Sequence, residues 1–302
     1  MSVYDMAMIE LVADDDSAII SGGGFDRRDI KLSVDPDDLF SDELDLKIIE
    51  SAFAPGGMAG AEEYPVRTLT LPFNLYDNGA GIEATVSRFR KLWRAGRTLL
   101  WQVTTQESGL RLLQLRRSQG IKFSPSQDWN ITGYARAVVT AVALNPFYES
   151  APLTMTVTNP SNGSNTFWLP VTNPTDQKAW PEWSLKPNGA TTFSFADFSF
   201  NNDQEIDPDW APGRFASRMI VTPSINVMWS VMSDPLMDTY VAADLSNANG
   251  QMQAVEPLFW IPPYTGTDAN GPVMLPVTIN GPAGSQVKLT LRRFWSAESG
   301  LE

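Results

Sequence analysis

Apolar residues along most of the chain recur at every second position, the spacing of β-strands, and one segment departs from this pattern. In GIEATVSRFRKLWRAG (81–96), apolar residues lie four, three and four positions apart: Ile82, Val86, Phe89 and Trp93. This spacing places them on one face of a helix. Gly96 follows in the position of a glycine that ends a helix. We predict that this segment is nearly the only helix in the protein.

Strand patterns surround this helix in the first half of the chain. Apolar runs bounded by turn residues indicate strands within 29–34, 43–51, 64–79, 98–105, 111–118 and 134–144. Gly109 ends a hairpin connection, and Pro146 breaks the last ladder. Residues 1–36 hold short apolar runs, which we expect to form short strands joined by turns.

The composition shifts near residue 151. Asn, Thr, Ser, Pro and Gly become dense, and no helical period of useful length follows. Short strands are predicted within 190–200, 213–223, 225–232, 256–264, 272–281 and 285–295. A chain of 302 residues exceeds the usual span of one domain. We therefore predict a mainly β protein with two domains, 1–150 and 151–302, the second a sandwich or jelly roll.

The composition and charge of the chain exclude several kinds of catalytic site, metal site and binding partner. The chain has no cysteine and no histidine, which excludes disulfides, thiolate nucleophiles, structural zinc sites and imidazole bases. A formal net charge of -13 opposes binding to nucleic acid and to anionic membranes. No apolar run is long enough for a membrane helix, and the N-terminus lacks a secretory pattern. We expect a soluble protein without cofactor, bound metal, nucleic acid or membrane insertion.

Two further segments invite a ligand interpretation. Gly22, Gly23 and Gly24 lack the spacing and the following helix of a phosphate loop, so we interpret them as a turn. The acidic run 35–45 lacks the glycine and glutamate of a calcium loop, and we interpret it as solvated.

A third acidic segment follows in the second half. Carboxylates alternate there in NNDQEIDPDWAPGRF (201–215), at Asp203, Glu205, Asp207 and Asp209. On one side of an extended segment they would suit calcium or a glycosidase pair, but two prolines favour a loop that is acidic to stay solvated.

The helical segment is also basic. Its arginines and the one that follows it lie mostly off the apolar face: Arg88, Arg90, Arg94 and Arg97. They either point into water from a helix packed on a sheet or pair with an acidic surface of a neighbouring copy. We take them as candidate assembly contacts.

Taken together, these residues resemble the distal tail proteins of siphophages (Dit-like proteins), in particular the minor tail proteins of this kind in phages of actinobacteria. In the first half the resemblance rests on RTLTLPFNL (67–75), SRFRKLWRAGRTLLWQV (87–103), GLRLLQLRRSQG (109–120) and ALNPFYES (143–150). In the second half it rests on LPVTNPTDQKAWPEWSL (169–185).

The resemblance implies a structural virion protein at the distal end of the tail, made in the host cytoplasm and not an enzyme. An N-terminal β-sandwich with one helix, the belt or ring domain, would form a homo-hexameric ring. A galectin-like β-sandwich would follow. The ring would join the tail tube protein and tape measure protein to the tail-associated tip proteins.

Two tryptophans in the second half leave an alternative open. The resemblance places Trp180 and Trp183 in an early strand of the second sandwich, where their rings would close its edge or end. Exposed rings also stack on sugars, so a carbohydrate-binding adhesion module that contacts glycans through these residues is the alternative function. An enzyme built on the carboxylates of 203–209 is a third hypothesis.

Overall fold

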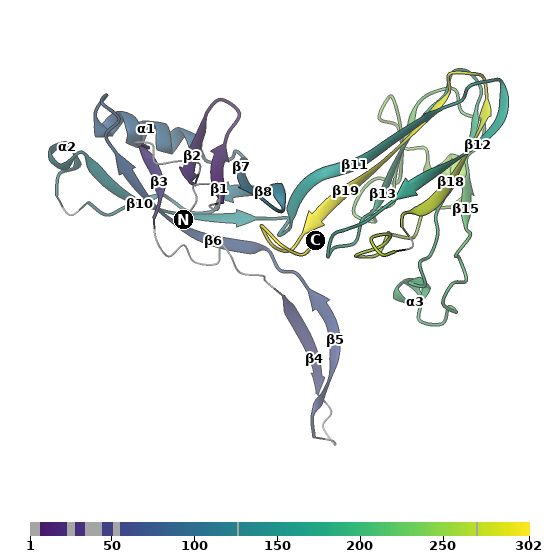
Figure 1. Ribbon diagram of the computed structural model, residues 1–302, viewed down its shortest axis with the longest axis horizontal. Coiled ribbons are helices and arrows are strands. Elements are labelled where there is room, and N and C mark those ends of the chain that lie inside the picture. Colours follow the sequence, from purple (N-terminus) through teal and green to yellow (C-terminus); the bar gives the residue numbers. More distant parts are fainter. Residues whose placement is uncertain (1–6, 23–27, 34–43, 51–54, 126, 270) are drawn as a thin grey trace. The chain divides into compact units, whose positions relative to one another are not determined.

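The computed structural model describes residues 7–22, 28–33, 44–50, 55–125, 127–269 and 271–302. The protein is mainly β, as predicted, and divides into two compact units (Figure 1). Unit 1 contains Met1–Ser150 together with Trp295–Glu302, and unit 2 contains Ala151–Phe294. The last eight residues, which we expected in the second domain, thus group with the first.

Unit 1 contains ten of the strands and two helices. The strands are β1 (Met8–Val12), β2 (Ser17–Ser21), β3 (Ile30–Leu32), β4 (Asp45–Glu50), β5 (Gly57–Glu63), β6 (Arg67–Tyr76), β7 (Leu99–Thr105), β8 (Gly109–Arg117), β9 (Lys122–Phe123) and β10 (Tyr134–Ala143). The helices are α1 (Ile82–Leu92) and the single-turn α2 (Trp129–Thr132), which the sequence did not predict. β2-β1-β7-β8 pair in that order, β10 pairs with β6, β8 and β9, and β6 pairs with β3. β4 and β5 form a sheet of their own.

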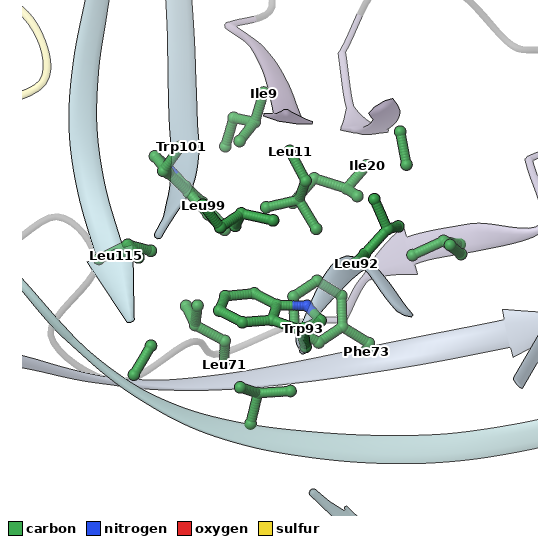
Figure 2. Packing of buried hydrophobic residues seen from close by; sticks show 14 of the residues in the cluster. Ile9, Leu11, Ile20, Leu71, Phe73, Leu92, Trp93, Leu99, Trp101 and Leu115 are labelled. Carbon is green, nitrogen blue, oxygen red and sulfur yellow. The ribbon is translucent and has the colours of Figure 1, made fainter. Parts of the chain in front are cut away.

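The core of unit 1 lies between these strands and α1. The predicted apolar face of α1 is confirmed, since Ile82, Val86 and Phe89 are buried together with Trp93. The rings of Phe89 and Trp93 lie 5.0 and 6.0 Å from that of Phe73 on β6. Figure 2 shows Trp93 between Leu71 and Phe73 of β6 and Leu99 of β7. Helix α1 and the residue that follows it therefore pack against both β6 and β7.

The end of α1 differs from the prediction. The helix ends at Leu92 with Trp93 as its C-cap residue, and Gly96 has a φ of 80° in the turn that follows. Trp93 is 1% exposed. Burial of this large side chain continues the apolar face one position beyond the helix, so the sequence pattern extends further than the hydrogen bonding.

Unit 2 is built from two sheets. The first has the order β17-β16-β13-β19-β11 and the second β12-β18-β14-β15. These strands are β11 (Tyr148–Thr158), β12 (Gly163–Val171), β13 (Pro181–Lys186), β14 (Thr192–Ala196), β15 (Met219–Val221), β16 (Trp229–Met232), β17 (Tyr240–Ala242), β18 (Val273–Gly281) and β19 (Gln286–Trp295). Two short helices, α3 (Asp203–Ile206) and the 3-10 helix η2 (Asn249–Met252), complete it. Trp183 and Leu289 of the first sheet share a core with Phe195 and Val277 of the second, as in a β-sandwich.

The strand predictions in this half need correction, and the short β17 is one of the strands that they missed. β11 and β12 were not predicted, because threonine and asparagine interrupt their apolar positions. Residues 256–264 form no strand, and only Ile261 makes an isolated bridge, to Ala179. Prolines at 257, 262 and 263 each remove a backbone donor and prevent a continuous ladder.

Some sequence interpretations fall outside the described residues. Gly23, Gly24 and most of the acidic run 35–45 belong to this group, and only Leu44 and Asp45 of that run are described. In the part of the chain that the structure covers, every helix is too short or too polar to cross a membrane.

Candidate assembly surfaces

Arg88 is held inside unit 1. Its Nε and Nη2 donate to the carboxylate of Asp16 at 2.7 and 2.9 Å, and its Nη1 donates to Asp29 at 3.0 Å. The hydrogen bond from Arg88 lowers the pKa of Asp16, and the same bond raises the pKa of Arg88. Arg88 thus fastens the turn after β1 and the residue before β3 to α1, so most of its hydrogen-bonding capacity serves the fold.

The other three predicted arginines each have a different environment. Arg97 lies 3.4 Å from Asp14 and 3.8 Å from Asp15, in exposed ion pairs that contribute little stability. Arg90 places its guanidinium 4.9 Å from the ring centre of Phe123. Arg94 is exposed and makes no ion pair with any described residue. The structure therefore brings together no single patch of four free arginines.

The strands β4 and β5 carry exposed apolar side chains; we call this hairpin the arm. Ile48 is 64% exposed, Ile49 57% and Met58 68%. All of β4 is exposed, and among the described strands β4 and β5 pair only with each other (Figure 1). A two-stranded hairpin is at best marginally stable in water without a further surface to pack on. The arm therefore has the properties of a segment that a partner covers.

The arm is also acidic. Among the described residues of its two strands, four are carboxylates and one is a lysine: Asp45, Glu50, Glu62, Glu63 and Lys47. Lys47 forms an exposed ion pair with Glu63. The remaining carboxylates give the arm a negative surface around its apolar residues.

Trp183 and Trp180 have different surroundings. Trp183 is 2% exposed, and its ring centre lies 5.2 Å from that of Phe195 in the core of unit 2. It presents no face to a sugar. Trp180 is half-buried, and its ring packs edge-to-face on Trp260 at 5.1 Å. The suggested pair of glycan-binding rings is therefore not formed as a joint platform.

Asn173 organises the polar backbone before these tryptophans. Its side-chain nitrogen donates to the carbonyls of Gln177, Ile261 and Pro262 at 2.8, 3.1 and 3.0 Å. Its Oδ1 accepts from the backbone N–H and the hydroxyl of Thr175. One buried amide thus satisfies the backbone of an irregular segment that makes only isolated β-bridges, to Thr265 and Ile261. The Asn-Pro-Thr order indicates a local turn but not the contacts to residues 261 and 262.

The acidic segment 203–209 serves the fold and is not extended. Asp203 begins the short helix α3, and its carboxylate accepts from the backbone N–H of Gly213 at 2.6 Å and Phe215 at 3.0 Å. Glu205 pairs with Lys178 at 2.7 Å. Within the described ranges, no group of three or more carboxylates could hold a metal ion. The carboxylates of Asp203 and Glu205 are therefore both engaged in contacts within unit 2.

Two buried arginines hold the C-terminal segment, a feature that the sequence did not show. Arg67 donates to the carbonyl of Ser296 at 2.7 Å. Arg111 is fully buried; it donates to the carbonyls of Ala297 at 2.8 Å and Gly300 at 2.6 Å, and to Glu302 at 2.7 Å. These bonds explain why the last residues group with unit 1.

No protein-family model matches the chain, and no curated protein matches it. Among solved structures it is similar to the Dit protein of phage SPP1, described as a paradigm of the hub adsorption apparatus in phages that infect Gram-positive bacteria. The TM-score is 0.54 at 11% identity, over 86% of this chain and 92% of that one. Two structures of the phage P2 baseplate in its activated conformation, with Ca and with Sr, align with TM-scores of 0.49 and 0.48. Their identities are 10% and 11%, over 95% of this chain and 98% of the other. The first likeness shows that this chain has the fold of a Dit protein, as the resemblance predicted.

Proposed function

We propose that this chain is a structural subunit of the distal tail hub of a long-tailed phage. In this proposal it assembles as a hexameric ring that joins the tail tube protein and the tape measure protein to the tip proteins. The fold shared with the SPP1 hub protein over most of both chains supports this role. Residues 1–150 would form the ring, and 151–302 would contribute a galectin-like sandwich, apart from the last eight residues, which belong to unit 1.

The observation that carries the proposal is the exposed arm. Ile48, Ile49 and Met58 would remain in water in an isolated subunit, at a cost of about 25 cal/mol for each square ångström of apolar surface that stays uncovered. An assembly removes this cost by covering the arm. A catalytic function has no comparable support, because the carboxylates of Asp203 and Glu205 are engaged in contacts that maintain the fold.

The experiment is to measure the mass of the purified protein by sedimentation velocity, alone and mixed with the tail tube protein of the same phage. We expect a closed oligomer with the mass of six subunits, and a ring with a central hole in negative-stain images. A protein that stays monomeric at about micromolar to tens of micromolar concentration, both alone and with that partner, would contradict the hub function.

A further inference from the structure

One face of the sheet formed by β3, β6, β10, β9 and the end of β8 is basic. Except at Pro72, which pairs with Val138 and is buried, its residues alternate with the buried ones along each strand and so lie on the side away from the core. The register places the following residues side by side on this face: Lys31, Thr68, Thr70, Asn74, Tyr76, Arg116, Lys122, Tyr134, Arg136, Val138, Thr140 and Val142. We call it the cationic face, because four of these residues are cations and none is a carboxylate.

The cations of this face have no ionic partner among the carboxylates that the structure describes. No described carboxylate forms an ion pair with Lys31, Arg116, Lys122 or Arg136, although the whole chain has a net charge of -13. Lys31 lies 5.1 Å from the ring centre of Tyr76, another residue of the face. A concentration of positive charge without counter-charge on an acidic protein points to an acidic partner.

Helix α1 does not cover the cationic face. Its buried residue Phe89 packs on Phe73, which belongs to the opposite, core side of β6. The cationic face also carries half-exposed apolar residues, Val138 and Val142, between its charges. It is therefore a mixed basic and apolar surface that α1 leaves uncovered and on which only Pro72 is buried.

We infer that the arm of one copy binds the cationic face of the next copy. The arm is acidic with exposed Ile48, Ile49 and Met58, and the face is basic with Val138 and Val142, so both charge and apolar surface are complementary. Arm and face are different surfaces of one chain, so each copy offers one of each. Such head-to-tail contacts close into a ring when the rotation between copies allows it. The inference rests on the proposed hub function and names the contact that would form the ring.

The absence of cysteine permits a direct test of this contact. Two variants are prepared, Met58→Cys on the arm and Val138→Cys on the face, and are mixed with a short bismaleimide. Because each chain carries one thiol, a covalent dimer of unlike chains forms only if the arm of one copy reaches the face of another. Leu236→Cys, at a 90% exposed position of unit 2, is the control for random collision. We expect efficient cross-linking of Met58→Cys to Val138→Cys and only background with Leu236→Cys.

Charge reversal tests the same contact without cross-linker. Lys31→Glu with Arg136→Glu should weaken self-association by about tenfold or more, and an arm with Asp45→Lys and Glu62→Lys should restore it when the two variants are mixed. Lys91→Glu with Arg94→Glu changes the net charge equally on exposed positions of α1 and its end, outside the face. That control should leave association within about twofold of the unchanged protein.

The outcomes separate this inference from the hub function. A ring that forms normally without the Met58–Val138 cross-link, or one weakened equally by the control, overturns the inference and leaves the hub function standing. Failure of the intact chain to form any oligomer, both alone and with the tail tube protein, removes both. If the face binds DNA and loses it with Lys31→Glu and Arg136→Glu, while no arm cross-link forms, the face is a nucleic-acid site and the inference is wrong.

Discussion

The guanidinium of Arg111 lies 3.9 Å from the ring centre of Trp295, and both side chains are buried in unit 1. The two residues are far apart in the chain, on β8 and at the end of β19. The indole N–H of Trp295 also donates to the hydroxyl of Ser150 at 2.9 Å. The C-terminal segment is thus fixed by a stacked cation and by a hydrogen bond at the junction where unit 1 gives way to unit 2 along the chain.

Replacing Arg111 tests this attachment. Arg111→Met keeps much of the side-chain volume but removes the donors to the carbonyls of Ala297 and Gly300, so we expect a loss of about 2–4 kcal/mol in the free energy of unfolding. Urea denaturation followed by tryptophan fluorescence measures it. Arg94→Met, at an exposed position, should change the free energy by less than about 0.5 kcal/mol. Equal effects of the two substitutions would contradict a structural role for Arg111.

Trp93 is the second test, because its ring is buried among Leu71, Phe73 and Leu99 in Figure 2. Trp93→Ala leaves a cavity next to Phe73, and we expect a loss of about 3–5 kcal/mol. Trp168→Ala is the matched control, since that ring is 59% exposed on β12. It should cost less than about 1 kcal/mol. Thermal unfolding by calorimetry distinguishes the two.

Asn173 is predicted to stabilise unit 2 through its amide. Asn173→Ala removes the donor to three buried carbonyls and should cost about 1–3 kcal/mol. Asn173→Asp preserves the shape but directs a carboxylate oxygen at those carbonyls, so it should be at least as destabilising. If Asn173→Asp unfolds at the same urea concentration as the unchanged protein, the amide donor has no role.

The pair Asp16 and Arg88 predicts a dependence on pH. The hydrogen bond from Arg88 holds the pKa of Asp16 below its ordinary value of 3.8, so the unfolded chain binds the proton more tightly than the folded one. The stabilisation is present above the unfolded pKa and is lost as the pH falls through the lower, folded pKa.

The measurement compares unfolding free energies of the unchanged protein and Asp16→Asn at pH 7 and at successively lower pH. The difference between them should be largest near neutral pH and should shrink below about pH 4. Asp14→Asn serves as control, because the side chain of Asp14 is 76% exposed and its ion pair is long. A difference for Asp16→Asn that does not change with pH would contradict the predicted role of the ion pair.

Features that depend on local spacing could be predicted from the sequence alone. The mainly β character, the position of α1 and its buried face of Ile82, Val86 and Phe89 follow from side-chain periodicity, because the periods of helix and strand are set by backbone geometry alone. The β10 strand and its end before Pro146 follow in the same way. The absence of histidine and cysteine needed no structure at all.

Contacts between residues that are distant in the sequence could be found only from the tertiary structure. Trp180 and Trp183 are alike in the sequence, yet only Trp183 is fully buried, because burial depends on sheets that pack from distant segments. Arg88 pairs with Asp16, 72 residues away, although the helical pattern indicated only an exposed arginine. The cationic face exists because strand register brings Lys31, Lys122 and Arg136 to one side of a sheet, and register is a long-range property that no local pattern contains.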